Sequence, residues 1–245
     1  MRPAREVIDA LRFLTRLRLP AVSEPAGHPH LRFGAAAFPL VGALLGAVAA
    51  GVDVGAAAVP QGLRNVGILA LWAAATGGLH YDGLADVLDA LGGRDVEDRL
   101  RIMRDGTVGT FAVLGLVLVV AAELCALSLL HGSARLHALV AAPILGRWAM
   151  LLTAFSAPSA RSDGLGREFV RCLSGAEVLL ATATTGIGLV LLYGAPVPSV
   201  WLLVALAAGG VRLLAGVRFG GVTGDVLGAS GKIGEALALA WFAAT

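Results

Sequence analysis

Three aspartates recur on one face of a predicted helix, at a spacing that suits the binding of a hard divalent cation. Asp82, Asp86 and Asp89 fall within an arc of about 60° when successive residues are placed about 100° apart. Carboxylates so placed repel one another unless a cation or a bound proton compensates their charge. Magnesium is typically held by a few carboxylates together with the phosphates of a substrate. The spacing therefore predicts a Mg²⁺ site that serves phosphoryl-type transfer, and the alternative is a solvated acidic helix face.

Further groups with suitable chemistry lie on either side of these aspartates. A carboxylate or a histidine can assist an attacking hydroxyl, so Asp82, Asp86 and His80 are catalytic candidates. For His80 an ordinary hydrogen-bonded histidine is an equal alternative. Arginines that face a metal–carboxylate cluster suit phosphate binding, and anchoring at the membrane surface is their alternative role. The candidates that follow the aspartates are Arg104 for catalysis, Arg101 for substrate binding and Asp105 for metal binding.

A glycine-rich segment near the C-terminus offers a second place for an anion. Residues 220–225 are Gly-Gly-Val-Thr-Gly-Asp. Such a loop lets backbone N–H groups approach a phosphate closely, so Thr223 and Gly224 are candidate substrate-binding residues. Asp225 is a candidate metal ligand alongside Asp82, Asp86, Asp89 and Asp105.

Other charged residues receive either a substrate-binding or a structural interpretation. Arg147 lies inside an apolar segment, where a charge is expensive unless it faces a polar cavity or a partner. We therefore expect Arg147 to face the polar site and to bind substrate. Asp95 and Asp98 are typical of a helix N-terminus, and Asp53 and Glu123 are interpreted as structural or interfacial.

The composition indicates that these residues belong to a membrane protein. Hydrophobic residues make up 57% of the 245 residues and charged residues 15%, whereas soluble domains carry about 25% charged residues. The mean hydropathy is +0.81. This composition excludes secreted, disordered and collagen-like classes, and the net charge of +2 gives no reason to expect a nucleic-acid partner. Cys125 and Cys172 have no neighbouring metal ligand and are predicted to be buried apolar residues.

The apolar segments predict an all-α, polytopic bundle of six to seven transmembrane helices in one membrane domain over residues 1–245. A spanning helix needs about 20 mainly apolar residues. The candidate spans cover residues 34–59, 62–79, 108–130, 136–157, 178–193, 199–217 and 226–244. The span over 62–79 is short, and the one over 226–244 is interrupted by Lys232 and Glu235.

The loop charges predict the orientation of this bundle. With seven spans, sixteen of the nineteen lysines and arginines fall on the side of the N-terminus. Arg64 and Arg135 fall on the opposite side, and Arg147 lies within a span. Positive residues favour the cytosolic side of an inner membrane. The N-terminus and the Asp/Arg-rich segment 80–106, interpreted as a helical active-site loop, are therefore expected in the cytosol.

The N-terminal segment 1–33 carries six arginines. Its first part combines apolar residues at helical spacing with charges on the other side, as in an amphipathic helix that lies in the headgroup plane. The alternative is a basic arm that only sets the topology.

Several motifs together resemble the cobalamin synthase family, the adenosylcobinamide-GDP ribazoletransferases. The central motif is Gly-Gly-Leu-His-Tyr-Asp-Gly-Leu-Ala-Asp at residues 77–86, running on to Asp89. The others are found at residues 12–17 (RFLTRL), 38–42 (FPLVG), 102–105 (IMRD), 109–110 (GT) and 221–229 (GVTGDVLGA). They occur in order over nearly the whole chain. Gly146 stands where the family tends to have a serine before the arginine.

The resemblance implies an integral membrane, Mg²⁺-dependent transferase of late cobalamin biosynthesis. It would join adenosylcobinamide-GDP to α-ribazole, or to α-ribazole 5′-phosphate, with release of GMP. The expected partners are these small molecules and the lipid bilayer, with possible association with other corrinoid-pathway enzymes or with itself.

Two other functions fit some of the same features. A CDP-alcohol phosphotransferase also has an aspartate cluster among membrane helices, but only Leu84 separates Asp-Gly from Ala-Asp here, where that family has two residues. A cation transporter would place its charges near the middle of the bilayer at broken helices. The aspartates here lie beside arginines at the end of a span.

Overall fold

A computed structural model describes residues 3–17, 19, 34–194 and 197–245. The described residues form helices joined by short connections, and apart from one isolated bridge they contain no β-structure. The elements are α1 (Pro3–Leu14), η1 (Ala35–Ala37), α2 (Phe38–Gly55), α3 (Gln61–Thr76), α4 (Leu79–Ala90), α5 (Val96–Ile102), α6 (Thr110–Leu129), α7 (Gly132–Ala154), α8 (Leu165–Cys172), α9 (Gly175–Tyr193), α10 (Pro198–Phe219) and α11 (Gly224–Ala244). The predicted all-α membrane fold is confirmed.

Six helices in the described residues are long and apolar enough to span a membrane. They are Ala35–Gly55, Thr110–Leu129, Gly132–Ala154, Gly175–Tyr193, Pro198–Phe219 and Gly224–Ala244. The predicted span over 226–244 is among them, despite its charges. The one over 62–79 is not, because α3 has 16 residues and reaches only about 24 Å at about 1.5 Å per residue. The hydrocarbon core of a bilayer is about 30 Å thick.

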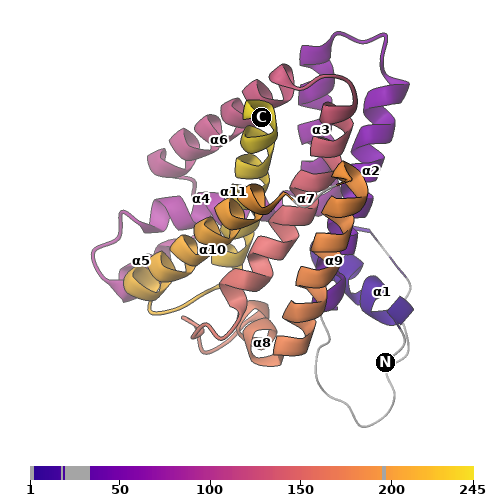
Figure 1. The fold of residues 1–245 in the computed structure, drawn as a ribbon. Helices are drawn as coiled ribbons and strands as arrows, with labels where there is room; N and C mark the ends of the chain where they lie inside the picture. The colour runs from indigo at the N-terminus through magenta and orange to yellow at the C-terminus, as the bar shows by residue number, and fades with distance from the viewer. Residues whose placement is uncertain (1–2, 18, 20–33, 195–196) are drawn as a thin grey trace.

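The helices of the bundle join two ends of the molecule (Figure 1). The far end holds the turns after α2 and α6, and it is tied together by Asp53, which forms ion pairs with Arg64 at 3.1 Å and with Arg135 at 2.8 Å. Gln61 also donates hydrogen bonds there to the carbonyls of Leu127 and Leu130. Thus both cations that the sequence assigns to the opposite side meet the same buried aspartate, which confirms the structural interpretation of Asp53.

The other end, called the α1 end because α1 packs there, holds the chemistry-bearing segments. Ala10 and Leu14 of α1 are fully buried. Phe13 stacks on Phe38 at a centroid distance of 5.8 Å and on Phe169 of α8 at 5.6 Å. The N-terminal helix is therefore part of the packed bundle. Much of the predicted basic segment 1–33 lies outside the described residues.

The Asp-rich segment 80–106 is helical, as the sequence predicted. It forms α4 and α5 joined by a short turn, and α4 packs mainly on α11 and α6. Leu84, Val87 and Ala90 are buried, because these apolar residues face α11 and α6 while the aspartates face outward. The central position in the bundle belongs to α7, which is buried along most of its length (Figure 1).

The two cysteines differ from expectation. Cys125 and Cys172 are both exposed free thiols. Cys125 lies on α6, a spanning helix with most of its surface uncovered by the protein, so its small apolar side chain is exposed where membrane lipid would be.

Candidate active site

The carboxylates of α4 and α11 meet because the two helices touch at glycines. A Cβ atom added at Gly83 would lie 2.6 Å from the carbonyl oxygen of Asp225, and one at Gly228 would lie 3.0 Å from that of Leu79. Any larger residue at Gly83 would push the start of α11 away from α4. The glycine therefore sets the short separation between the aspartate face of α4 and Asp225.

The raised pKa of Asp86 reflects its burial and the closeness of the other carboxylates. Burial raises the pKa of Asp86 to about 6, and the negative charges of Asp225, Asp82 and Asp89 add to the effect, while Arg161 opposes it. Asp82 is exposed, and Asp86 and Asp225 are half-buried. Three predicted metal ligands thus form one acidic cluster, Asp82, Asp86 and Asp225, at the α1 end.

The side chains of the acidic cluster are not already arranged to coordinate a metal ion. Among residues 3–17, 19, 34–194 and 197–245, no group of three or more His, Cys, Asp or Glu side chains is placed to hold a metal ion. The donors are nevertheless the hard oxygen ligands that Mg²⁺ takes, and their mutual repulsion favours a cation. A Mg²⁺ ion at this cluster would therefore need water and substrate phosphates to complete its coordination.

Asp89 has a different set of contacts. Its two carboxylate oxygens accept hydrogen bonds from the backbone N–H groups of Gly109, at 2.6 Å, and Ala112, at 2.8 Å. It thereby satisfies free N–H groups at the start of α6. The structure gives Asp89 the work of a helix cap, which helical spacing alone did not reveal.

Arg161 is the functional candidate that sequence reasoning missed. Its guanidinium lies 3.2 Å from the carboxylate of Asp225. A short bridge between Ser159 and Val222 holds the two segments together, with Val222 N–H donating to the carbonyl of Pro158 at 2.8 Å. Positively charged loops are common in such chains, so nothing in the spacing marked this arginine.

Gly221 makes the close approach of these segments possible. Its φ is 156°, and a Cβ there would lie 2.5 Å from the carbonyl oxygen of Pro158. The following residues start α11: the Thr223 hydroxyl accepts a hydrogen bond from the N–H of Val226 at 3.2 Å and lies 3.2 Å from Asp225. Thr223 is buried, whereas Gly224 is exposed. Of the two predicted substrate-binding residues, Gly224 is thus the accessible one.

The predicted residues of α5 and the turn after it lie on the exposed rim. Arg104 pairs with Asp163 at 2.9 Å, and Arg101 pairs with Asp98 at 2.6 Å. Asp105 accepts a hydrogen bond from Thr107 at 3.3 Å and is not among the groups that raise the pKa of Asp86. The structure therefore does not place Asp105 in the acidic cluster. Asp95 caps α5 through the N–H of Asp98 at 2.9 Å, in agreement with its structural interpretation.

His80 and Arg147 are both buried away from the acidic cluster. His80 lies about 160° around α4 from Asp82 and is 3% exposed. Its pKa is well below the ordinary value because it is buried and because Arg147 and Lys232 are positive. Arg147 forms an ion pair with Glu235 instead of facing the polar site. The prediction that Arg147 faces the polar site is therefore wrong. For His80, the burial favours the alternative of an ordinary packed histidine over a catalytic group.

The glycine that precedes Arg147 is explained by the same packing. A Cβ at Gly146 would lie 2.6 Å from Cγ of Glu235 and 2.7 Å from the carbonyl oxygen of Gly231. A serine at this position would require α7 and α11 to separate.

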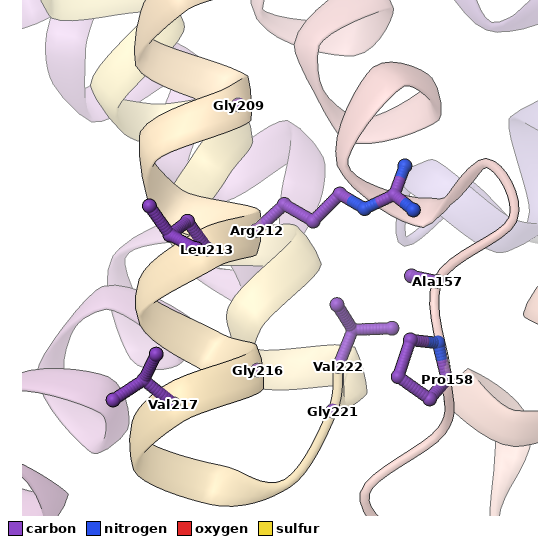
Figure 2. Close-up of a pocket in the computed structure, with 9 residues that line it drawn as sticks. All are labelled: Ala157, Pro158, Gly209, Arg212, Leu213, Gly216, Val217, Gly221 and Val222. Atoms are coloured by element: carbon purple, nitrogen blue, oxygen red, sulfur yellow. The ribbon is translucent and has the colours of Figure 1, made fainter.

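An apolar cavity of about 310 Å³ lies beside the Gly221–Val222 turn. In Figure 2, Arg212 extends from α10 toward the segment after α7, and Val222 and Pro158 stand opposite α10. Arg212 donates hydrogen bonds to the carbonyls of Phe155 and Ser156 at 2.6 and 3.0 Å. No carboxylate lines this cavity, so it is distinct from the acidic cluster.

Known proteins resemble the chain over nearly its whole length. A family model described as cobalamin-5-phosphate synthase matches residues 6–243. An adenosylcobinamide-GDP ribazoletransferase of Syntrophobacter fumaroxidans is 40% identical over 237 residues, with 94% of each chain covered. Another, of a Roseiflexus species, is 37% identical over 248 residues, covering 97% of this chain and 89% of the relative. A third, of Pseudomonas syringae, is 40% identical over 227 residues, with 90% and 91% covered. No solved structure shows significant similarity to the chain.

Proposed function

The chain belongs to the cobalamin-5-phosphate synthase family, and we propose that it carries out the family's ribazole transfer at the acidic cluster of α4 and α11. It is an adenosylcobinamide-GDP ribazoletransferase of cobalamin biosynthesis. Adenosylcobinamide-GDP and α-ribazole, or its 5′-phosphate, give adenosylcobalamin, or its 5′-phosphate, and GMP. The observation that carries the proposed site is the meeting of Asp82, Asp86 and Asp225 beside Arg161.

The bond changes define what the site must do. A ribazole hydroxyl oxygen forms a bond to the cobinamide-side phosphorus, and the bond from that phosphorus to the bridging oxygen breaks. GMP leaves with the bridging oxygen, and the hydroxyl proton must pass to a base. Such transfers depend mainly on positioning and on neutralisation of phosphate charge.

The residues of the cluster divide these tasks. Asp82 and Asp225, with Asp86, would hold Mg²⁺, and the ion when bound neutralises the diphosphate. Where Asp86 is not bound to the ion, burial raises its pKa to about 6, and it is then suited to accept the ribazole hydroxyl proton. The exposed N-terminus of α11 at Gly224 would meet a phosphate oxygen through backbone N–H groups.

Two arginines would bind the phosphates. Arg161 is half-buried next to Asp225 and would contact the transferred phosphate. Arg104 is paired with Asp163, and both side chains are largely exposed. Exposed ion pairs contribute little stability, so Arg104 can exchange its partner for GMP at small cost.

We place the α1 end at the cytosolic face of the inner membrane. With seven crossings, the sequence assigns sixteen of the nineteen cations to this side. Although α3 is short, it returns the chain to the α1 end, where the carbonyl of Ala75 accepts a hydrogen bond from the N–H of Arg16 at 2.8 Å. Of the sixteen, Lys232 is buried within α11 and does not count toward this face. The soluble nucleotide substrate then reaches the acidic cluster from the cytosol.

The test is GMP release by detergent-solubilised enzyme across a Mg²⁺ titration. We expect Asp86→Asn and Asp225→Asn to lower turnover by about 100-fold or more, because both remove charge that a hard cation requires. Asp163→Asn is the matched control: it removes an exposed aspartate from the rim and should leave turnover within about twofold. Wild-type turnover in both cluster variants would refute the site, and absence of GMP release from wild-type enzyme would refute the activity.

A further inference from the structure

Four buried charged side chains and one half-buried tyrosine, from four helices, form a network inside the bundle. They are Tyr81 on α4, Glu123 on α6, Arg147 on α7, and Lys232 and Glu235 on α11. The ammonium group of Lys232 lies 2.7 Å from Glu123, 2.9 Å from Glu235 and 4.1 Å from the centre of the Tyr81 ring. The Tyr81 hydroxyl donates to Glu123 at 2.8 Å. Arg147 completes the network by its ion pair with Glu235.

The network holds two positive and two negative groups within spanning helices. None of Glu123, Arg147, Lys232 and Glu235 is more than 2% exposed. Ionisable residues at such positions are costly and generally mark function. The charges balance, so the network as a whole is neutral, and removal of a single member would leave one buried charge without compensation.

The network also bears on the rotation of α4, the helix that carries the aspartates, about its own axis. α4 follows Gly77 and Gly78, both with positive φ, so the chain turns sharply between α3 and α4. Its closest approach to α11 is at the glycines Gly83 and Gly228, and around this contact apolar residues such as Leu84 and Val87 pack inside the bundle. Tyr81 adds directed polar contacts at the start of the helix. Tyr81 directly precedes Asp82, about 100° away around the same axis. Holding the Tyr81 ring therefore sets the direction in which Asp82 projects.

We propose that Tyr81, Glu123 and Lys232 are positioning residues that fix the rotation of α4 and so direct Asp82 and Asp86 toward Asp225. The Tyr81 ring is held from two sides: its hydroxyl by Glu123 and its face by Lys232. The Arg147–Glu235 pair supplies the remaining charges that keep this arrangement neutral. The inference rests on the proposed function for its kinetic consequence, and on the contacts alone for its structural one.

The first experiment removes only the Tyr81 hydroxyl. Tyr81→Phe keeps the ring over Lys232 but loses the hydrogen bond to Glu123. We expect kcat to fall about tenfold with KM for adenosylcobinamide-GDP changed less than about twofold, because the aspartates are misdirected while the substrate contacts remain. Tyr193→Phe is the matched control. Tyr193 lies at the far end on α9, and its buried hydroxyl has no hydrogen-bond partner, so its loss should leave kcat unchanged.

The second experiment separates positioning from charge balance. Lys232→Met leaves an excess buried negative charge and should lower the melting temperature of the purified enzyme. The double variant Glu123→Gln/Lys232→Met restores neutrality, and we expect it to melt near wild type. Its kcat should nevertheless stay at least about tenfold low, because the Tyr81 anchor is not restored.

A third measurement requires neither substrate nor metal. Amide hydrogen exchange over residues 79–90 should accelerate in Tyr81→Phe and in the double variant, while exchange in α7 stays as in wild type. Wild-type kcat together with wild-type exchange in these two variants would overturn the positioning role. If wild-type enzyme releases no GMP, the proposed activity fails, and the exchange of α4 still decides whether the network holds this helix.

Discussion

Replacing Gly83 by alanine tests whether the separation of α4 and α11 controls the chemistry. The new Cβ would lie 2.6 Å from the carbonyl oxygen of Asp225, whereas ordinary contact begins at 3.4 Å. The two helices must therefore separate by up to about 0.8 Å at this point, given close packing of protein interiors. Because the obstructing atom is backbone, no side chain can rotate away to relieve the contact.

Two opposing terms set the effect of Gly83→Ala on stability. Alanine favours a helix over glycine by about 1 kcal/mol, whereas inserting a methyl group into a packed contact costs about 1–3 kcal/mol. We expect a net loss of about 0–2 kcal/mol, seen as a small decrease in melting temperature. Turnover should fall much more, by about tenfold to 100-fold, because displacement of about 1 Å in a catalytic arrangement has that effect.

The assay is GMP release at saturating substrate, alongside thermal melting of the purified protein. Gly210→Ala on α10 is the control, because a Cβ there meets nothing within 4 Å. It should keep wild-type turnover and melt at the same temperature or slightly higher. If Gly83→Ala turns over as fast as Gly210→Ala, then the contact of α4 with Asp225 does not position the reacting groups.

Three further predictions follow from particular residues. In metal-free enzyme, the folded-state pKa of Asp86, about 6 against an ordinary 3.8, means that stability is lost as pH rises from about 4 to 6. After allowance for solvent screening, the free energy of unfolding should fall by roughly 1–2 kcal/mol over this pH range. Thermal melting of Asp86→Asn should show a smaller fall than that of the wild type. Equal falls in the two proteins would contradict the assignment of the raised pKa to Asp86. Asp95→Ala should cost about 1 kcal/mol of stability by removing the cap of α5, with turnover falling less than twofold; a loss of turnover without a loss of stability would refute the structural role. For topology, Arg94 has a side chain that is 89% exposed. In intact cells that express enzyme lacking Cys125 and Cys172, we expect a cysteine placed at Arg94 to resist an impermeant reagent and one at Gly132 to be labelled; the reverse pattern would invert the orientation. Ala90 is unsuitable for labelling because it is fully buried.

The helices could be predicted from the sequence because each depends on a local property. Runs of about 20 apolar residues gave the spans, and the helical spacing of Asp82, Asp86 and Asp89 gave their common face. The run over 62–79 was predicted to be a span, and this was wrong, because α3 has only 16 residues. The involvement of Asp225 was also predictable, since a glycine-rich turn before an acidic residue is a local pattern.

The partners of the charged residues could not be predicted, because they come from distant parts of the chain. Arg161 meets Asp225 only through the bridge of Ser159 with Val222. Arg147 was correctly identified as a charge that needs compensation, but the sequence could not show that Glu235, 88 residues later, provides it. For Asp89, helical spacing fixed the face of α4 and not what lies opposite, which is the start of α6.

The distribution of charge among three clusters explains why the α1 end is the site. At the far end, the one carboxylate of Asp53 meets two arginines, and in the middle the network of Glu123, Arg147, Lys232 and Glu235 is balanced. At the α1 end, Asp82, Asp86 and Asp225 face Arg161 alone among the groups that act on Asp86. This acidic cluster is also the one with an exposed carboxylate, that of Asp82. Of these three clusters, the acidic cluster is therefore the one whose negative charge is left uncompensated, at the position where we propose that a cation and a diphosphate bind together. The cation and the diphosphate would arrive together with the substrate. The negative charge of the acidic cluster would then be neutralised when they bind, and not when the protein folds.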